Sequence, residues 1–152
     1  MLISRTSQYA IQALIYIALK DAGQLVLSRE VAEQLGVPSA YLAKIMQALC
    51  KGGLLESFRG RLGGFALRES PERVDLRRIL LITEGPDFSK DCVLGLKVCS
   101  DETACPMHER WKPIKTEILA MLEEQNLANL AEAVKVGKYR LTDIPGILLS
   151  MQ

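Results

Sequence analysis

The chain has 152 residues, 49% of them hydrophobic and 24% charged, so it can bury one core but is too short for several large domains. Its formal net charge of +1 excludes a protein that binds nucleic acid or anionic membranes through overall charge alone. Residues 1–69 hold eight Lys and Arg against five Asp and Glu, whereas residues 70–152 hold eleven against thirteen, so the N-terminal half is the better candidate for contacting phosphates.

The first predicted helix spans Ser4–Lys20, where apolar side chains recur at helical spacing and Ser4 or Thr6 can cap the N-terminus. Its apolar stretch is shorter than the roughly 18 residues that a membrane span needs. The stretch ends in Lys20 and Asp21 without a small-residue cleavage site, unlike a signal peptide. We therefore expect a cytoplasmic protein that does not interact with membranes.

Two short helices with a tight turn between them are predicted next. We expect Ser28 to cap a helix over Arg29–Leu35 and Ser39 to cap a helix over Ala40–Lys51, with Gly36 ending the first of the two. This spacing is typical of a helix-turn-helix, whose second helix can project its N-terminal end into the major groove of DNA. The candidate DNA contacts on these helices are Arg29, Ser39, Tyr41 and Lys44.

A β-hairpin with a basic loop is predicted after the third helix. Strand-like segments over Leu54–Phe58 and Phe65–Leu67 flank a link that contains three glycines and the arginines Arg59 and Arg61. Arginine favours phosphates and narrow minor grooves, so both arginines join the candidate DNA contacts. With a fourth helix at about Asp75–Thr83, this order predicts a winged helix-turn-helix domain over residues 1–83. Protein-binding winged helices share the helical pattern, and the basic wing is what favours DNA.

Three of the four cysteines lie in the next segment, residues 84–106. Cys92, Cys99 and Cys105 fall within fourteen residues, and His108 follows three residues after the last of them. Thiolate and imidazole are ligands that soft and borderline metals prefer, and in a reducing compartment clustered cysteines bind metal more often than they form disulfides. Cys50, on the third helix, instead fits a small buried hydrophobic residue. We therefore expect a metal centre to order this cysteine-rich loop.

Two kinds of metal centre compete for these four ligands. Zinc accepts three cysteines and one histidine, but structural zinc sites usually have about two to four residues between paired cysteines, and the gaps here are six and five. Iron–sulfur clusters take thiolates and in some cases histidine. The residues alone favour an iron–sulfur cluster slightly, and structural zinc or redox-active cysteines without a cofactor stay open. A thiol oxidoreductase is disfavoured, since the chain has no Cys-x-x-Cys pair and one histidine, so we expect no enzyme.

A long helix from Pro106 to about Gln125 is predicted after the cysteines, and its apolar stripe is not needed by the core of the winged helix. The stripe can fold back onto the same domain or pair with a second chain. We favour a homodimer, because DNA readers of this type place two recognition helices on half-sites about one helical turn apart. A short helix near Leu127–Val136 completes the dimerisation region, residues 107–136, and no role is predicted for the tail, residues 137–152.

Five stretches carry a likeness to known proteins: SQYAIQAL in the first helix, LGVPSAYLAKIMQALCKGGLLES across the helix-turn-helix, RGRLGGFAL in the wing, the three cysteines, and LANLAE after the long helix. Together they resemble the IscR/NsrR/RirA group of bacterial winged-helix regulators (the Rrf-two family) over roughly residues 2–131. The resemblance implies a homodimeric transcriptional repressor or activator on a palindromic operator in double-stranded DNA. It also implies a [2Fe-2S] or [4Fe-4S] cluster on Cys92, Cys99 and Cys105, which would sense iron, redox state or nitric oxide.

Three positions bear on how closely the chain follows this family. In IscR-like proteins a histidine three residues after the last cysteine is the fourth ligand, which here is His108. Some NsrR-like proteins use a carboxylate in the first helix instead, where this chain has Gln8, a poor ligand. Ala43 stands where IscR has a glutamate that helps to discriminate DNA sites. We therefore expect His108 as the fourth ligand and do not expect the same operator.

Overall fold

The computed structural model describes residues 3–137 and 139–141 and is mostly helical, with one two-stranded antiparallel hairpin. In chain order the elements are α1 (Arg5–Ala18), α2 (Ser28–Leu35), α3 (Ser39–Lys51), β1 (Leu55–Phe58), β2 (Gly64–Leu67), η1 (Pro71–Arg73), α4 (Leu76–Thr83), η2 (Phe88–Lys90), α5 (His108–Glu124) and α6 (Leu127–Lys135). This confirms the predicted fold class. None of the described helices is long and apolar enough to cross a lipid bilayer.

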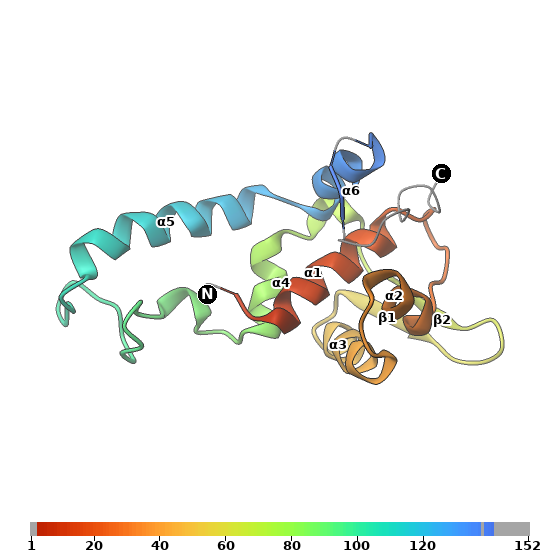
Figure 1. The fold of residues 1–152 in the computed structure, drawn as a ribbon, viewed down its shortest axis with the longest axis horizontal. Helices are drawn as coiled ribbons and strands as arrows, with labels where there is room; N and C mark the ends of the chain where they lie inside the picture. Colours follow the sequence, from red (N-terminus) through yellow and green to blue (C-terminus); the bar gives the residue numbers. More distant parts are fainter. Residues whose placement is uncertain (1–2, 138, 142–152) are drawn as a thin grey trace.

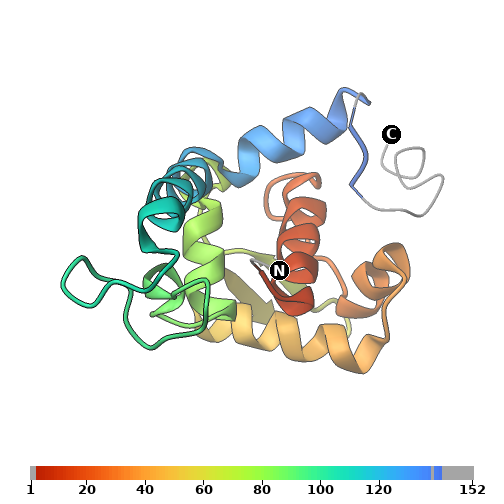
Figure 2. The ribbon, with the colours of Figure 1, turned by 60° about the vertical axis from the view of Figure 1, so that its left-hand side comes forward.

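Helices α1, α2, α3, α4 and α6 share one core and form what is called the N-terminal body. Helix α1 lies in its centre, among α3, α4 and α6 (Figure 2). The Ser4 side chain caps it by accepting a hydrogen bond from the backbone N–H of Ser7, as predicted. Small and apolar residues recur every three or four positions, so the helix buries Ala10, Ala13 and Leu14 completely. Among the described residues, α2, α3, α4 and α6 contribute apolar side chains to this core, and α5 contributes none.

The turn between α2 and α3 depends on Gly36, whose φ of 67° lies in the left-handed region and ends α2 as predicted. The predicted side-chain caps at Ser28 and Ser39 are wrong, because each serine is the first residue of its helix and neither helix has a side-chain cap. Leu27 and Pro38 hold the N-cap positions with extended backbones. Pro38 suits this position because it needs no hydrogen-bond partner for its nitrogen.

The wing is the hairpin of β1 and β2 with the loop Arg59–Gly63 between them. Gly63 is required here, because a Cβ atom at this position would overlap the carbonyl oxygen of Phe58. Val26, which precedes α2, pairs with Phe65 through two backbone hydrogen bonds of 2.9 and 2.8 Å. The wing is therefore anchored to the helix-turn-helix rather than attached only through its own ends.

Residues 84–107 connect α4 to α5 with only the short η2 inside them. Helix α5 begins at His108, two residues later than predicted, because a turn with a 3.0 Å hydrogen bond from the His108 N–H to the Cys105 carbonyl precedes it. The chain then returns to the core, where α6 packs on α1. Figure 1 shows that the cysteine loop and the wing lie at opposite ends of the longest axis.

Candidate functional site

The outer surface of the helix-turn-helix and the wing carries most of the predicted DNA contacts. Five of the six are exposed to solvent: Arg29, Ser39, Lys44, Arg59 and Arg61. Within the described residues none of the four charged side chains among them forms an ion pair. Cations without an internal partner on a protruding loop and on a helix-turn-helix are available to phosphates.

Tyr41 is placed differently from the other five. Its side chain is half-buried, and its hydroxyl forms a 2.7 Å hydrogen bond with the hydroxyl of Thr6 on α1. Its ring lies edge-on to that of Tyr9, with 6.0 Å between the ring centroids. Thr6, which the sequence offered as a helix cap, therefore holds the N-terminal part of α3 against α1.

The cysteine loop brings its first and last cysteines together. The Cys92 and Cys105 sulfur atoms lie 3.4 Å apart, and the backbone N–H of Leu94 points at the Cys92 sulfur from 3.4 Å. This N–H is the main reason that the pKa of Cys92 lies below its usual value, and the N–H of Leu96 and the Cys105 thiol add to the effect. Cys92 is thus disposed to be a thiolate, the form of cysteine that binds metals and reacts with oxidants.

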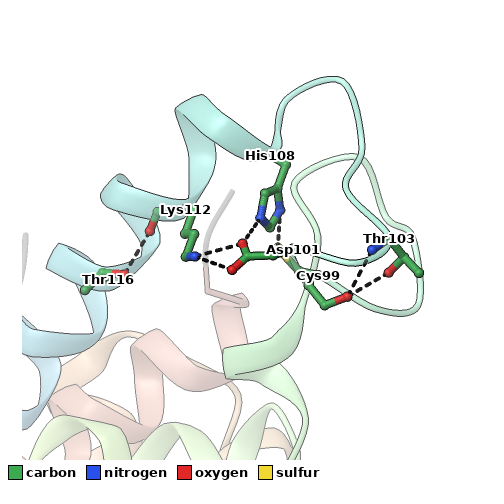
Figure 3. Close-up of polar contacts among 7 residues, drawn as sticks. Cys99, Asp101, Thr103, His108, Lys112 and Thr116 are labelled. Carbon is green, nitrogen blue, oxygen red and sulfur yellow. Dashed lines mark hydrogen bonds and ion pairs between the residues drawn. The ribbon is translucent and has the colours of Figure 1, made fainter.

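The second pair is Cys99 with His108, whose Nδ1 lies 3.6 Å from the Cys99 sulfur (Figure 3). The other ring nitrogen, Nε2, lies 2.8 Å from a carboxylate oxygen of Asp101. Lys112, one turn along α5, contacts both oxygens of this carboxylate at 2.8 Å. Hydrogen bonds from Lys112 and then His108 lower the pKa of Asp101 below its ordinary range.

Asp101 and Lys112 were not identified from the sequence. A signal for Lys112 was present, since it stands four residues after His108 on the same helix face. Asp101 lies in an irregular turn, and no periodicity points to it.

The two pairs do not form one ready-made coordination shell. Over residues 3–137 and 139–141, no three or more His, Cys, Asp and Glu side chains are grouped closely enough to hold a metal ion. A cavity of about 270 Å³ adjoins Cys92 between the loop and α5, and both apolar side chains, such as Phe88 and Trp111, and charged ones, Glu84, Asp91 and Lys115, line it. The donor chemistry fits a thiolate-bound metal centre, while the three cysteines and His108 are held as two separate pairs, Cys92 with Cys105 and Cys99 with His108.

Comparison with known proteins identifies the family. The family model Rrf2, described as an iron-dependent transcriptional regulator, matches residues 3–133. The chain belongs to the Rrf2 family. A protein of Aquifex aeolicus named as an HTH-type transcriptional regulator is 32% identical over 120 residues, which span 78% of this chain and 83% of that protein.

Two solved structures with the Rrf2 fold are similar to this one. IscR from T. potens has a TM-score of 0.72 at 24% identity, covering 91% of each chain. CymR, the global cysteine regulator of B. subtilis, has a TM-score of 0.71 at 23% identity, covering 86% of this chain and 95% of that chain. These likenesses concern the fold and confirm the predicted winged helix-turn-helix.

Membership of the Rrf2 family confirms the predicted resemblance and the general function, a DNA-binding transcriptional regulator. It also confirms that the chain is not an enzyme. The choice of DNA contacts, the metal ligands and the domain boundaries stay predictions, because neither the fold nor the family assigns them to individual residues.

Proposed function

We propose that this protein is a homodimeric transcriptional repressor that holds an iron–sulfur cluster on Cys92, Cys99, Cys105 and His108. The signal it senses is iron supply, redox state or nitric oxide, and each of these acts on the cluster or on its thiolate ligands. The observation that carries the proposal is the approach of these four side chains in two pairs, Cys92 with Cys105 and Cys99 with His108.

The pairing favours a [2Fe-2S] over a [4Fe-4S] cluster, because each of two irons takes two protein ligands. Bound in this loop, the cluster would supply a site that oxidants and nitric oxide can attack. The chain's own residues prepare for it: the N–H of Leu94 stabilises the Cys92 thiolate, and α5 fixes His108 at its first turn. The four side chains lie close together in two pairs but do not form a single coordination shell. This arrangement suits a loop that becomes ordered when it binds its metal centre.

The homodimer is supported by the exposed apolar face of α5. Ile114 and Met121 are each 52% exposed, and together with Ile118 they line a shallow hollow along the helix. A second α5 packed antiparallel against this face would cover it and would place two wings on one palindromic operator. Since α5 starts at His108, a change of order in the loop would act directly on the helix that sets the distance between the two wings.

On the DNA side, we propose that Arg29, Ser39, Lys44, Arg59 and Arg61 contact the duplex. All five are exposed, and the two wing arginines can reach a minor groove or the phosphates beside it. Tyr41 takes a positioning role instead, because its hydroxyl is hydrogen-bonded to that of Thr6 and its ring packs edge-on against the ring of Tyr9. It would fix the angle at which α3 enters the major groove.

A second candidate is a redox-sensing regulator without a cofactor. It is favoured by the 3.4 Å between the Cys92 and Cys105 sulfur atoms and by the lowered pKa of Cys92. Oxidation of the two thiols by hydrogen peroxide would join them in a disulfide and release two water molecules. Structural zinc is the weakest alternative, because the paired ligands are separated along the chain by more residues than zinc knuckles use.

Anaerobic purification followed by iron, sulfide and zinc analysis decides among the three. We expect visible colour, iron and acid-labile sulfide in equal amounts, and DNA affinity that changes when the cluster is removed. Zinc in a colourless protein would support the structural-zinc regulator. A protein without metal, even after reconstitution with iron and sulfide, would leave the cofactor-free thiol sensor.

A further inference from the structure

His108 is the only histidine of the chain, and its side chain is 3% exposed. Its two ring nitrogens have different partners: Nε2 lies 2.8 Å from Asp101, and Nδ1 lies 3.6 Å from the sulfur of Cys99. Figure 3 shows a contact from the ring to each of these two groups, with Lys112 on the far side of the carboxylate. The ring is therefore oriented by contacts on both of its edges.

The chemistry of the carboxylate decides which nitrogen carries the proton. Both oxygens of Asp101 contact the ammonium group of Lys112 at 2.8 Å, which is the arrangement of an ionised carboxylate. An ionised carboxylate can only accept hydrogen bonds, so the nearby Nε2 must donate one. In a neutral imidazole the lone pair is then on Nδ1, the nitrogen that faces Cys99.

We propose that Asp101, held in place by Lys112, fixes His108 in the tautomer with the proton on Nε2 and so makes Nδ1 the nitrogen that binds the metal centre beside Cys99. The second half of this proposal rests on the proposed function, whereas the tautomer is a property of the metal-free protein. Asp101 is a positioning residue, which acts through His108 rather than as a ligand.

Asp101 is suited to a test because its side chain is 71% exposed and is not part of the hydrophobic core, so we expect its replacement to leave the helical core intact. A matched control lies on the same loop. Asp87 pairs with Lys90 at 3.0 Å, both side chains are highly exposed, and neither contacts His108. Asp87→Asn therefore removes an aspartate charge from the loop without touching the imidazole.

The first experiment uses the metal-free protein labelled with ¹⁵N in histidine, in which all ring signals come from His108. We expect nitrogen shifts of a protonated Nε2 and a bare Nδ1 in the wild type and in Asp87→Asn, and an averaged mixture of both tautomers in Asp101→Ala. Equal shifts in the wild type and Asp101→Ala, or a proton on Nδ1 in the wild type, would overturn the role of Asp101.

The second experiment uses the loaded protein with ¹⁵N at either Nδ1 or Nε2, examined by electron paramagnetic resonance of the reduced cluster. We expect strong coupling from the Nδ1 label alone. Because outer partners of a ligand histidine typically contribute about 10–100-fold to metal affinity, we also expect Asp101→Ala to lose its cluster to a chelator at least about tenfold faster than Asp87→Asn.

The outcomes separate this proposal from the proposed function. Strong Nε2 coupling, or no histidine coupling in a protein that contains iron and sulfide, leaves a cluster-binding regulator and overturns the assignment of Nδ1. A protein that takes up neither iron nor sulfide overturns both the proposed function and the assignment of Nδ1, while the tautomer measurement still decides the role of Asp101.

Discussion

The N-terminal body and the cysteine loop are held together by different physical means. Helices α1, α2, α3, α4 and α6 share one core in which Leu14, Leu42 and Leu127 are completely buried. Residues 85–107 bury one side chain, Cys92, and expose five large apolar ones by about half of their surface: Val93, Leu94, Leu96, Val98 and Met107. Hydrophobic burial stabilises the body, whereas the loop depends on a few short polar and sulfur contacts.

This difference in packing indicates which region can change its structure when a ligand binds. Burying a core leucine contributes about 1.5–3 kcal/mol, so the body keeps its shape whatever is bound elsewhere. The loop lacks such contributions, and its arrangement can therefore respond to a metal centre or to oxidation of its thiols. The exposed apolar side chains next to the cysteines are available to be covered when the loop binds its proposed metal centre or when the proposed second chain packs against it.

The largest expected effect is the all-or-none loss of the cofactor in Cys105→Ala. Removal of one sulfur from the Cys92–Cys105 pair should abolish the visible chromophore of the proposed cluster. The helical circular dichroism should persist because the core does not include this residue, and so should the proposed dimer. Cys50→Ala is the matched control, since Cys50 lies on α3 outside the loop. Colour that survives in the anaerobically purified Cys105→Ala protein would refute the ligand assignment.

The next largest effect is on the free energy of unfolding, and it should differ between a leucine of the core and a leucine of the loop. Leu14→Ala should lower the free energy of unfolding by about 2–5 kcal/mol, because it leaves a cavity in the centre of the core. Leu96→Ala, at a side chain that is 51% exposed, should change it by less than about 0.5 kcal/mol. Denaturant unfolding of the metal-free protein at a fixed protomer concentration measures both. Similar losses for the two variants would show that the loop is part of the folded core.

Most of the fold could be predicted from the sequence because the body follows simple periodic rules. The apolar spacing of α1, the glycine that ends α2 and the basic link of the hairpin each specify local structure through nearby residues. The caps of α2 and α3 were wrong because a serine one position inside a helix has the same sequence signature as a serine at its N-cap. Deciding between them requires the backbone conformation of the preceding residue.

The candidate site could be predicted only as a set of ligand types. The spacing of Cys92, Cys99 and Cys105 indicates a metal loop, but it does not indicate which cysteine faces which partner. The pairing of Cys99 with His108 arises from a turn in an aperiodic segment, and the contact of Asp101 with Lys112 joins that turn to a helix. Contacts of this kind depend on three-dimensional closure of a loop, which no periodic pattern encodes.

The junction between the two regions is sensitive to pH through Glu84. Burial would raise the pKa of this carboxyl, but hydrogen bonds from Ser7 and Ser4 outweigh it, so the pKa lies below its ordinary value. A depressed pKa means that the carboxylate stabilises the fold above the unfolded value of about 4.3 and that this contribution is lost as the pH falls through the folded value.

Glu84→Gln should therefore reduce the free energy of unfolding by about 1–2 kcal/mol at pH 7, with a difference from the wild type that shrinks below about pH 4.3. Unfolding curves at a series of pH values test this, and Glu72→Gln, at an exposed glutamate in η1, serves as the control. A difference that is independent of pH would mean that the charge of Glu84 is not what stabilises the junction.

The smallest effect concerns the wing, at the end of the molecule opposite the cysteine loop (Figure 1). Arg59→Ala should weaken binding to all DNA sequences by about 1 kcal/mol and should reduce the slope of log affinity against log salt by about 1, because one phosphate contact is lost. Arg73→Ala, at an exposed arginine in η1 beside α6, should change neither quantity. Titration of labelled operator and random DNA at several salt concentrations gives both the affinity and the salt slope.

An unchanged slope with lower affinity for the operator alone would mean that Arg59 recognises bases. The wing would then contribute to sequence specificity rather than to binding of DNA in general.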